Sequence, residues 1–272
     1  MTAIALTIAG SDPSGGAGIQ ADLKTFAALE VYGASVIAAL TAQNTQGVTA
    51  IHDVPGDFIG AQMDAVFSDL DIAAVKIGML SQVTAIKAVA AGLRRHHAKN
   101  MVLDPVMAAT SGDRLLAADA IAALRRELIP FVLVVTPNLA EAAALSGGSL
   151  ARNEDEMEVQ AREILSLGAR NVLIKGGHGD GDESVDILIG QSQGFGEVVR
   201  MSAKRIATKN THGTGCTLSS AVAAGLAKGR DLITAAQEAK AYVTAAIANA
   251  DALQVGHGHG PLHHFYREWR EP

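Results

Sequence analysis

The chain has 272 residues, of which 49% are hydrophobic and 18% charged, and its formal net charge is −6 at pH 7. This composition predicts a globular protein with a large core and excludes a disordered chain. The acidic balance without a basic stripe argues against nucleic-acid binding, and the apolar runs fall short of the ~18 residues that predict a membrane-spanning helix. The single cysteine, Cys216, excludes an intramolecular disulfide and favours a cytoplasmic location.

Short apolar runs alternate with helical patterns from the beginning of the chain. Asp57 and Ser81 are the expected N-caps of two of the helices. In the first half, strands are predicted at 3–9, 36–42, 48–54, 73–77 and 101–103, and helices at 19–29, 57–70, 81–97 and 117–128.

The same alternation continues in the second half, where residues 184–189 and 197–201 form a predicted hairpin. The other strands are predicted at 132–135 and 171–174, and the helices after Asn138 and at 154–167, 216–228 and 231–249. The pattern predicts an α/β fold in one domain, residues 1–272, with a mostly parallel central sheet and helices on both faces. Ligands bind beyond the carboxyl ends of the strands in such sheets.

Residues 210–216, Asn-Thr-His-Gly-Thr-Gly-Cys, open an alanine-rich helix. Gly213, Thr214 and Gly215 let successive N–H groups face one point, and the helix N-terminus adds a positive potential there. This predicts an anion site, although a glycine turn beside a buried cysteine would give the same pattern. In the first turn, the helix dipole is expected to favour the Cys216 thiolate.

Residues 10–18 form a second glycine-rich loop. The loop lacks the Gly-Lys-Ser/Thr of a Walker A motif. It matches a dinucleotide-binding fingerprint only loosely, because the second predicted strand does not end in an aspartate or glutamate. A dinucleotide-dependent oxidoreductase is therefore the weaker hypothesis. Asp12 and Asp22 are candidate substrate contacts, and Asp22 is alternatively a solvated acid on a helix.

Polar residues follow several other predicted strands. Asp104 ends one strand, and Asn138 and Glu141 share a helix face after another, which suits either Mg²⁺ or helix capping. Lys175, before a glycine pair, is placed to reach a triphosphate or else is a surface lysine. In the tail, the spacing of four histidines (257, 259, 263 and 264) matches no standard zinc site, so a structural role is favoured.

Taken together, eight segments of the chain resemble the hydroxymethylpyrimidine/phosphomethylpyrimidine kinases of the ribokinase-like superfamily. The resemblance covers essentially the whole chain, and the first and last of these segments together are highly specific. The segments are residues 8–22, 41–45, 76–79, 103–107, 136–141, 174–178, 212–217 and 256–261.

The resemblance implies a ribokinase-like three-layer sandwich and the transfer of phosphate from ATP, with Mg²⁺, to an aminopyrimidine alcohol and then to its monophosphate, in thiamine biosynthesis. It implies substrate contacts from Gly10, Asp22, Gln43, Met79 and Val106. The Gln43 amide can pair with an aminopyrimidine edge, and Met79 can pack on the ring.

Further roles follow from the same resemblance. Residues 213–215 correspond to the anion hole, and Cys216 stands where many relatives carry an aspartate base. We expect Gly213→Asp to abolish turnover and leave the fold largely intact. Nucleotide contacts are implied for Asn138, Lys175, Thr208 and Lys240, and metal contacts for Asp104 and Glu141.

Other hypotheses remain beside the main one. A pyridoxine or pyridoxal kinase of vitamin B6 salvage would share the same signature, and a non-catalytic metabolite sensor would share the binding residues. The expected partners are small-molecule substrates, with no nucleic acid and no membrane, and the family suggests a homodimer.

Overall fold

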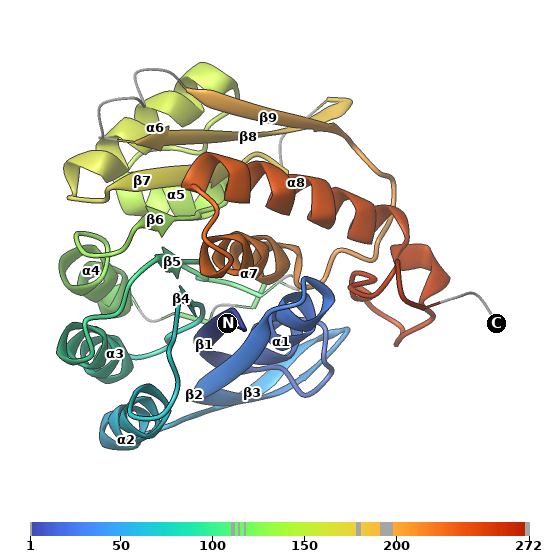
Figure 1. Ribbon diagram of the computed structural model, residues 1–272. Helices are drawn as coiled ribbons and strands as arrows, with labels where there is room; N and C mark the ends of the chain where they lie inside the picture. The colour runs from blue at the N-terminus through green and yellow to red at the C-terminus, as the bar shows by residue number, and fades with distance from the viewer. Residues whose placement is uncertain are drawn as a thin grey trace.

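The computed structural model describes residues 2–109, 112–113, 115–116, 118–177, 181–190 and 198–269. These residues form a nine-stranded sheet with the strand order β3-β2-β1-β4-β5-β6-β7-β8-β9 (Figure 1). The strands are β1 (Ile4–Ser11), β2 (Tyr32–Asn44), β3 (Gly47–Asp53), β4 (Ala74–Ile77), β5 (Met101–Leu103), β6 (Val134–Val135), β7 (Asn171–Lys175), β8 (Glu183–Gly190) and β9 (Val199–Lys204).

The centre of the sheet is parallel and both of its edges are antiparallel. Strands β2, β1, β4, β5, β6 and β7 pair in parallel. Strand β3 pairs antiparallel with β2 at one edge, and β8 and β9 form an antiparallel extension of β7 at the other. The predicted mostly parallel α/β sheet is therefore confirmed.

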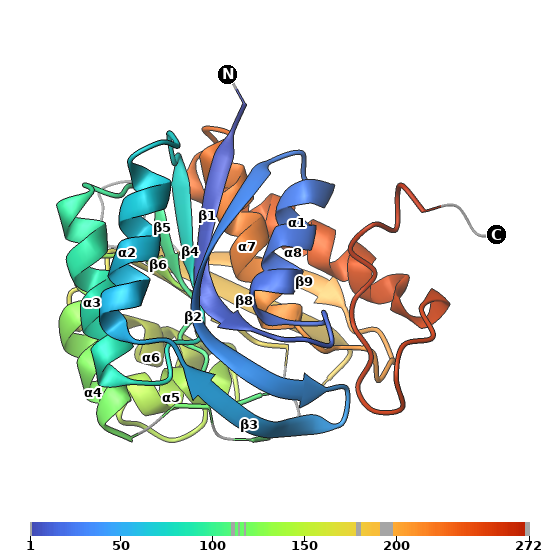
Figure 2. The same ribbon diagram turned by 90° about the horizontal axis from the view of Figure 1, so that it is seen from below.

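Helices cover both faces of the sheet (Figures 1 and 2). One face carries α2 (Gly56–Phe67), α3 (Val83–Arg95), α4 (Ala118–Glu127), α5 (Leu139–Ser146) and α6 (Glu154–Ser166), and the other carries α1 (Gly18–Ala28), α7 (Thr214–Ala227) and α8 (Leu232–Ala248). A short 3-10 helix, η1 (Ala250–Ala252), follows α8. Among the described residues, none of the helices is long and apolar enough to cross a membrane.

The central strands are continuous apolar runs because both of their faces are buried. In β7, Val172 and Ile174 pack into the core beneath α2–α6, whereas Leu173 between them packs into the core beneath α1, α7 and α8. A residue on either face of such a strand is expected to be apolar or paired. Lys76, fully buried in β4, is therefore an anomaly that requires a partner.

Several expected helix boundaries differ from those observed. Pro55 and Gln82 are the N-cap residues of α2 and α3, so the N-caps predicted at Asp57 and Ser81 are wrong. Asp57 lies in the first turn of α2, and the Ser81 hydroxyl instead donates to Asp53. The start of the predicted helix at 117–128 and that of the predicted strand at 197–201 lie outside the described residues.

Candidate active site

A cavity of about 560 Å³ lies at the carboxyl ends of the central strands. It is lined by all but two of the residues predicted to form the site: Gly10, Gln43, Met79, Asp104, Val106, Asn138, Glu141, Lys175, Gly213, Thr214, Gly215, Cys216 and Lys240. The strand pattern brings them together because β1, β4, β5, β6 and β7 all run in parallel and end at the same edge.

Asp12 holds the first glycine-rich loop in place. One of its carboxylate oxygens accepts from the Ser14 N–H (2.9 Å), and the other accepts from the Gly16 and Ala17 N–H groups (3.2 and 2.8 Å). The second oxygen also lies 2.8 Å from Nε2 of His212, the residue just before the second glycine motif. Burial alone would raise the pKa of Asp12, but the hydrogen bonds from His212 and Ser14 outweigh it and lower the pKa. Asp12 therefore joins the two glycine loops and holds a negative charge between them.

The second glycine motif starts α7 with Gly213 in the left-handed conformation (φ 84°). A Cβ at Gly213 would lie 1.9 Å from the Gly16 carbonyl oxygen. Any side chain here must displace the first loop, so Gly213→Asp is expected to disturb this loop as well as turnover, and the expectation that the rest of the fold stays largely intact remains a prediction. The Thr214 N–H already donates to the Thr211 carbonyl (3.2 Å), so the first-turn N–H groups of Gly215 and Cys216, which lack intrahelical partners, are the donors suited to an anion.

Cys216 lies half-buried at the wall of the cavity. Burial raises the pKa of Cys216 to about 11, and nearby Asp22 and Asp104 add to this effect, while Lys76 opposes it. The expected thiolate is therefore wrong: the loss of solvent and the two carboxylates outweigh the helix terminus. A thiol with this pKa is protonated at neutral pH.

Asp104, Lys175 and Glu141 form a buried charged cluster beside the start of α7, where the Ser219 hydroxyl donates to Asp104 Oδ2 at 3.3 Å. The Lys175 ammonium lies 2.6 Å from Asp104 Oδ1 and 3.8 Å from Glu141 Oε2. Burial acts to lower the pKa of Lys175, but Asp104 and Glu141 outweigh it and raise the pKa, so the lysine keeps its charge. The alternative of a surface lysine is wrong, since Lys175 is 9% exposed.

Glu141 also has a structural task. Its carboxylate accepts from the Asn138 N–H (2.8 Å), and the Asn138 side chain accepts from the Glu141 N–H (2.9 Å), which makes a capping box at the start of α5. The capping alternative is thus confirmed, while both side chains still face the cavity. Burial, reinforced by Asp104 and opposed by Lys175, raises the pKa of Glu141.

A second buried ion pair lines the cavity beside α8. Lys240 Nζ lies 2.9 Å from Asp186 Oδ2 and 3.1 Å from the Ser184 hydroxyl oxygen. The other Asp186 oxygen accepts from the Gly176 N–H at 2.9 Å. The pair fixes β8 and α8 against the glycines that follow β7, and it places a cation at this end of the cavity.

At the other end, the cavity is bordered by a small apolar cluster. Met79 packs with Ala39 and Leu115, and Val106 packs against them. Gly10 lies close enough that a Cβ there would be 3.2 Å from Met79 Cε. The Gln43 carbonyl oxygen lies 3.0 Å from the Thr41 hydroxyl, which orients the amide at the cavity wall. One amide beside an apolar surface suits a flat heteroaromatic ring with polar edges.

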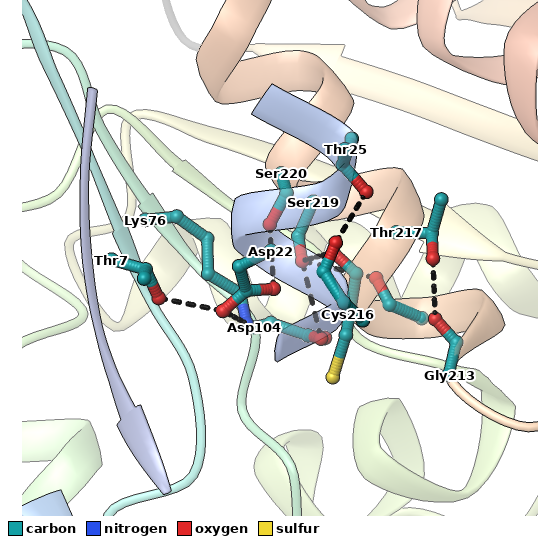
Figure 3. Close-up of polar contacts among 12 residues, drawn as sticks. Thr7, Asp22, Thr25, Lys76, Asp104, Gly213, Cys216, Thr217, Ser219 and Ser220 are labelled. Atoms are coloured by element: carbon teal, nitrogen blue, oxygen red, sulfur yellow. Dashed lines mark hydrogen bonds and ion pairs between the residues drawn. The ribbon is translucent and has the colours of Figure 1, made fainter. Parts of the chain in front are cut away.

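Two of the predicted contact residues, Asp22 and Thr208, do not line the cavity. Asp22 is fully buried behind it, where it accepts from the Thr7 hydroxyl (2.6 Å), the Ser220 hydroxyl (2.7 Å) and the Lys76 ammonium (2.9 Å), as Figure 3 shows. It is neither in direct reach of a substrate nor a solvated helix acid. Thr208 instead donates a hydrogen bond to Asp251.

Sequence reasoning assigned no role to Lys76 or His212. Burial acts to lower the pKa of Lys76, but the negative charges of Asp22 and Asp104 outweigh it and raise the pKa. A lysine inside a predicted buried strand was the available signal, because a fully buried charge needs a partner. For His212, the sequence offered only its position before the glycine motif.

The donor set near Asp104 fits a divalent cation. Two buried carboxylates share one lysine, and the raised pKa of Glu141 marks a carboxyl whose charge is under-neutralised. Mg²⁺ prefers carboxylate oxygens and keeps several waters, so two protein ligands are sufficient. Among the described residues, this site included, no group of three or more His, Cys, Asp or Glu side chains is arranged for a metal ion.

The fold and the cavity are those of an α/β phosphotransferase of the ribokinase-like class. The sheet is mostly parallel, and one cavity at its edge brings together the glycine-rich start of a helix, a paired lysine and two carboxylates. The family model described as phosphomethylpyrimidine kinase matches residues 12–263. The chain belongs to this family and is a kinase.

Relatives and solved structures agree with this assignment. A protein from Rhizobium meliloti (strain 1021) named hydroxymethylpyrimidine/phosphomethylpyrimidine kinase is 61% identical over 271 residues, which is 100% of each chain. A phosphomethylpyrimidine kinase from Clostridium difficile 630 is 45% identical with a TM-score of 0.78, over 90% of this chain and 99% of that chain. A Bacillus subtilis pyridoxal kinase, solved as an ADP complex, is 37% identical with a TM-score of 0.88, over 97% and 98%.

Proposed function

We propose that the protein transfers the γ-phosphoryl group of ATP to the hydroxymethyl group of 4-amino-5-hydroxymethyl-2-methylpyrimidine, and then a second phosphoryl group to the resulting monophosphate. The observation that carries the proposal is that the amide and apolar surface suited to a pyrimidine line the same cavity as the anion-binding start of α7 and the paired Lys175. Relatives covering the whole chain carry the name of this activity.

In this proposal, the residues of the site have separate tasks. Gln43 pairs with the aminopyrimidine edge, while Gly10, Met79 and Val106 form the surface on which the ring lies. The substrate oxygen then attacks the γ-phosphorus, the bond to the β-phosphate oxygen breaks, and ADP leaves. In the first transfer the hydroxyl proton is released to water, and in the second the attacking phosphate oxygen has no proton to lose.

Charge stabilisation comes from the start of α7 and from two lysines. The N–H groups at the start of α7 face the charge that develops on the transferred group, and Lys175 and Lys240 neutralise the nucleotide phosphates. Cys216, protonated at neutral pH, contributes no ready base. The reaction then depends chiefly on positioning and charge stabilisation.

Mg²⁺ belongs to the same proposal. Asp104 and Glu141 would hold it, with Asn138 beside them. The ion would supply charge neutralisation between the nucleotide phosphates. A homodimer, a cytoplasmic location, a single domain and a nucleotide contact from Thr208 stay predictions.

Substrate choice tests the proposal. Purified protein is given Mg-ATP with hydroxymethylpyrimidine, its monophosphate or pyridoxal, and ADP release and product mass are followed. We expect turnover of both pyrimidines with kcat/KM well above that for pyridoxal. Preference for pyridoxal would move the function to vitamin B6 salvage, which the names of structural neighbours at 33–37% identity make the second candidate. Tight NADH binding without ADP release would favour the oxidoreductase.

A further inference from the structure

The C-terminal segment, residues 256–264, crosses from the tip of the β2–β3 hairpin to the start of α7 (Figure 2). Neither of these two places is near residues 256–264 in the sequence. The hairpin carries Gln43, and α7 begins at the anion-binding glycines. The segment therefore joins two parts of the cavity wall.

At the hairpin, the segment is bonded to one residue, Thr45. The Thr45 hydroxyl accepts from the N–H groups of His257 (3.2 Å) and Gly258 (3.1 Å), and the Thr45 carbonyl accepts from the His259 N–H (2.8 Å). A Cβ at Gly258 would lie 2.0 Å from the Thr45 carbonyl oxygen. The approach therefore requires glycine, and it fixes the turn that lies two residues after Gln43.

At the other end, the segment is bonded to the backbone of the anion loop. The His212 N–H donates to the Gly260 carbonyl at 3.0 Å. A Cβ at Gly260 would lie 2.2 Å from Asn210 Oδ1, so this contact also depends on a glycine. His212 is in turn bonded to Asp12, so the segment, the anion loop and the first glycine loop meet at one residue.

A second contact runs from the segment into the first turn of α7. The Thr217 hydroxyl donates to the Gly213 carbonyl at 2.9 Å, and His264 Nε2 lies 3.0 Å from the same hydroxyl oxygen. The Thr217 hydroxyl is therefore bonded both to the Gly213 carbonyl and to the His264 ring. His264 itself is held by the Tyr242 hydroxyl, which donates to its carbonyl at 2.9 Å.

Burial keeps the His264 ring uncharged. Burial, reinforced by Lys24 and His263 and opposed by a hydrogen bond to the Leu262 backbone, lowers the pKa of His264 to about 4. The ring is therefore neutral across the physiological range. Its bond to Thr217 holds the hydroxyl beside the Gly213 carbonyl, which also accepts from the Thr217 N–H at 2.9 Å. These bonds together fix the peptide plane that leads into the Gly215 and Cys216 N–H groups.

We propose that Thr217 and His264 are positioning residues of the anion loop, and that residues 256–264 couple this loop to the β2–β3 hairpin that holds Gln43. This rests on the proposed function, since it assigns the loop to the transferred phosphoryl group. The coupling holds the wall of the cavity that contains Gln43 at a fixed position relative to the start of α7. The substrate oxygen then lies at the correct distance from the phosphorus.

Matched pairs of variants test the positioning role. Thr217→Val removes the hydroxyl at nearly constant volume, and Thr217→Ser keeps it. His264→Leu removes the ring nitrogen that bonds to Thr217, and His264→Gln keeps a polar group that can bond to the hydroxyl. We expect kcat to fall about 10–100-fold in Thr217→Val and His264→Leu, with KM for the alcohol changed less than about threefold, because a small misplacement of reacting groups costs this much. The kcat values of Thr217→Ser and His264→Gln should stay within about threefold of that of the wild type.

The coupling is tested by a double-mutant cycle on kcat/KM with Thr45→Val and Thr217→Val. The two residues bond to different partners, so independent effects would multiply. We expect the double variant to lose at least about threefold less than the product of the single losses. If the losses of kcat/KM in the single variants simply multiply in the double variant, the coupling is overturned. The positioning role is overturned by an unchanged kcat in Thr217→Val, or by equal losses of kcat in Thr217→Val and Thr217→Ser.

Two controls keep the outcomes distinct. If His264→Leu fails to fold in a denaturant titration, the volume-conserving Thr217 pair decides the question. The series is measured on whichever alcohol the wild type phosphorylates. Preference for pyridoxal would therefore sink the proposed pyrimidine substrate and leave the positioning test intact.

Discussion

Replacing Lys76 by methionine is expected to destabilise the fold strongly. Its ammonium lies 2.9 Å from Asp22 Oδ2, and both side chains are 0% exposed. Lys76→Met keeps most of the apolar stem but leaves the Asp22 carboxylate buried with only the Thr7 and Ser220 hydroxyls. Breaking a buried pair from one side typically costs about 3–5 kcal/mol. That loss corresponds to a drop in melting temperature of about 6–20 °C in a protein of this size.

A denaturant titration of three variants measures the effect. Lys76→Met and Asp22→Asn each leave an unmatched partner, whereas the double variant leaves two neutral side chains. Replacing a buried pair as a whole is often close to neutral, so the double variant should lie within about 2 kcal/mol of wild type. A loss below about 1 kcal/mol in Lys76→Met, or a double variant as unstable as the sum of the singles, would refute the reasoning.

Three further predictions concern the walls of the cavity. Gly213→Ala should lower kcat by at least about 100-fold because its Cβ meets the Gly16 carbonyl, while Gly229→Ala, with a similar φ of 80° but open space, should keep wild-type kcat and pay only the backbone cost. The thiol of Cys216, with its pKa raised to about 11, should react with iodoacetamide at pH 8 about 100-fold more slowly than in the urea-unfolded chain. The Mg²⁺ concentration for half-maximal activity should rise as the pH falls from 8 to 6, because the raised pKa of Glu141 lets a proton compete with the metal, and Glu141→Gln should flatten this dependence.

Each of these predictions has a contradicting result. Equal kcat in the two glycine variants would remove Gly213 from the phosphoryl-binding wall. Alkylation of Cys216 at the unfolded rate would show that its thiolate is available at neutral pH. A pH slope for Mg²⁺ that persists in Glu141→Gln would assign the competing proton to another group.

The layer architecture could be predicted because it depends on local periodicity. Continuous apolar runs such as β7 indicate strands buried on both faces, and their parallel direction brings their carboxyl ends to one edge. That rule alone collects Asp104, Asn138 and Lys175 at one cavity. Helix N-caps were less predictable, because Asp57 and Ser81 offered suitable side chains two residues and one residue away from the caps that form.

Charge states and long-range contacts could not be predicted in the same way. The thiol of Cys216 is governed by burial and by Asp22 and Asp104, which come from distant parts of the chain. The contacts of Thr45 with the C-terminal segment join residues more than 200 positions apart and leave no periodic pattern. Asp22 looked like a substrate contact because a family motif contains it, yet its carboxylate is fully buried and bonded to Lys76, Thr7 and Ser220.

The stoichiometry of phosphorylation tests the central claim most directly. The protein is incubated with excess Mg-ATP and limiting hydroxymethylpyrimidine or its monophosphate, and ADP and product are quantified together by ³¹P NMR. We expect two ADP per alcohol, one ADP per monophosphate, and a single diphosphate product in both cases. One ADP per alcohol with no diphosphate, or no reaction with either pyrimidine, would contradict it.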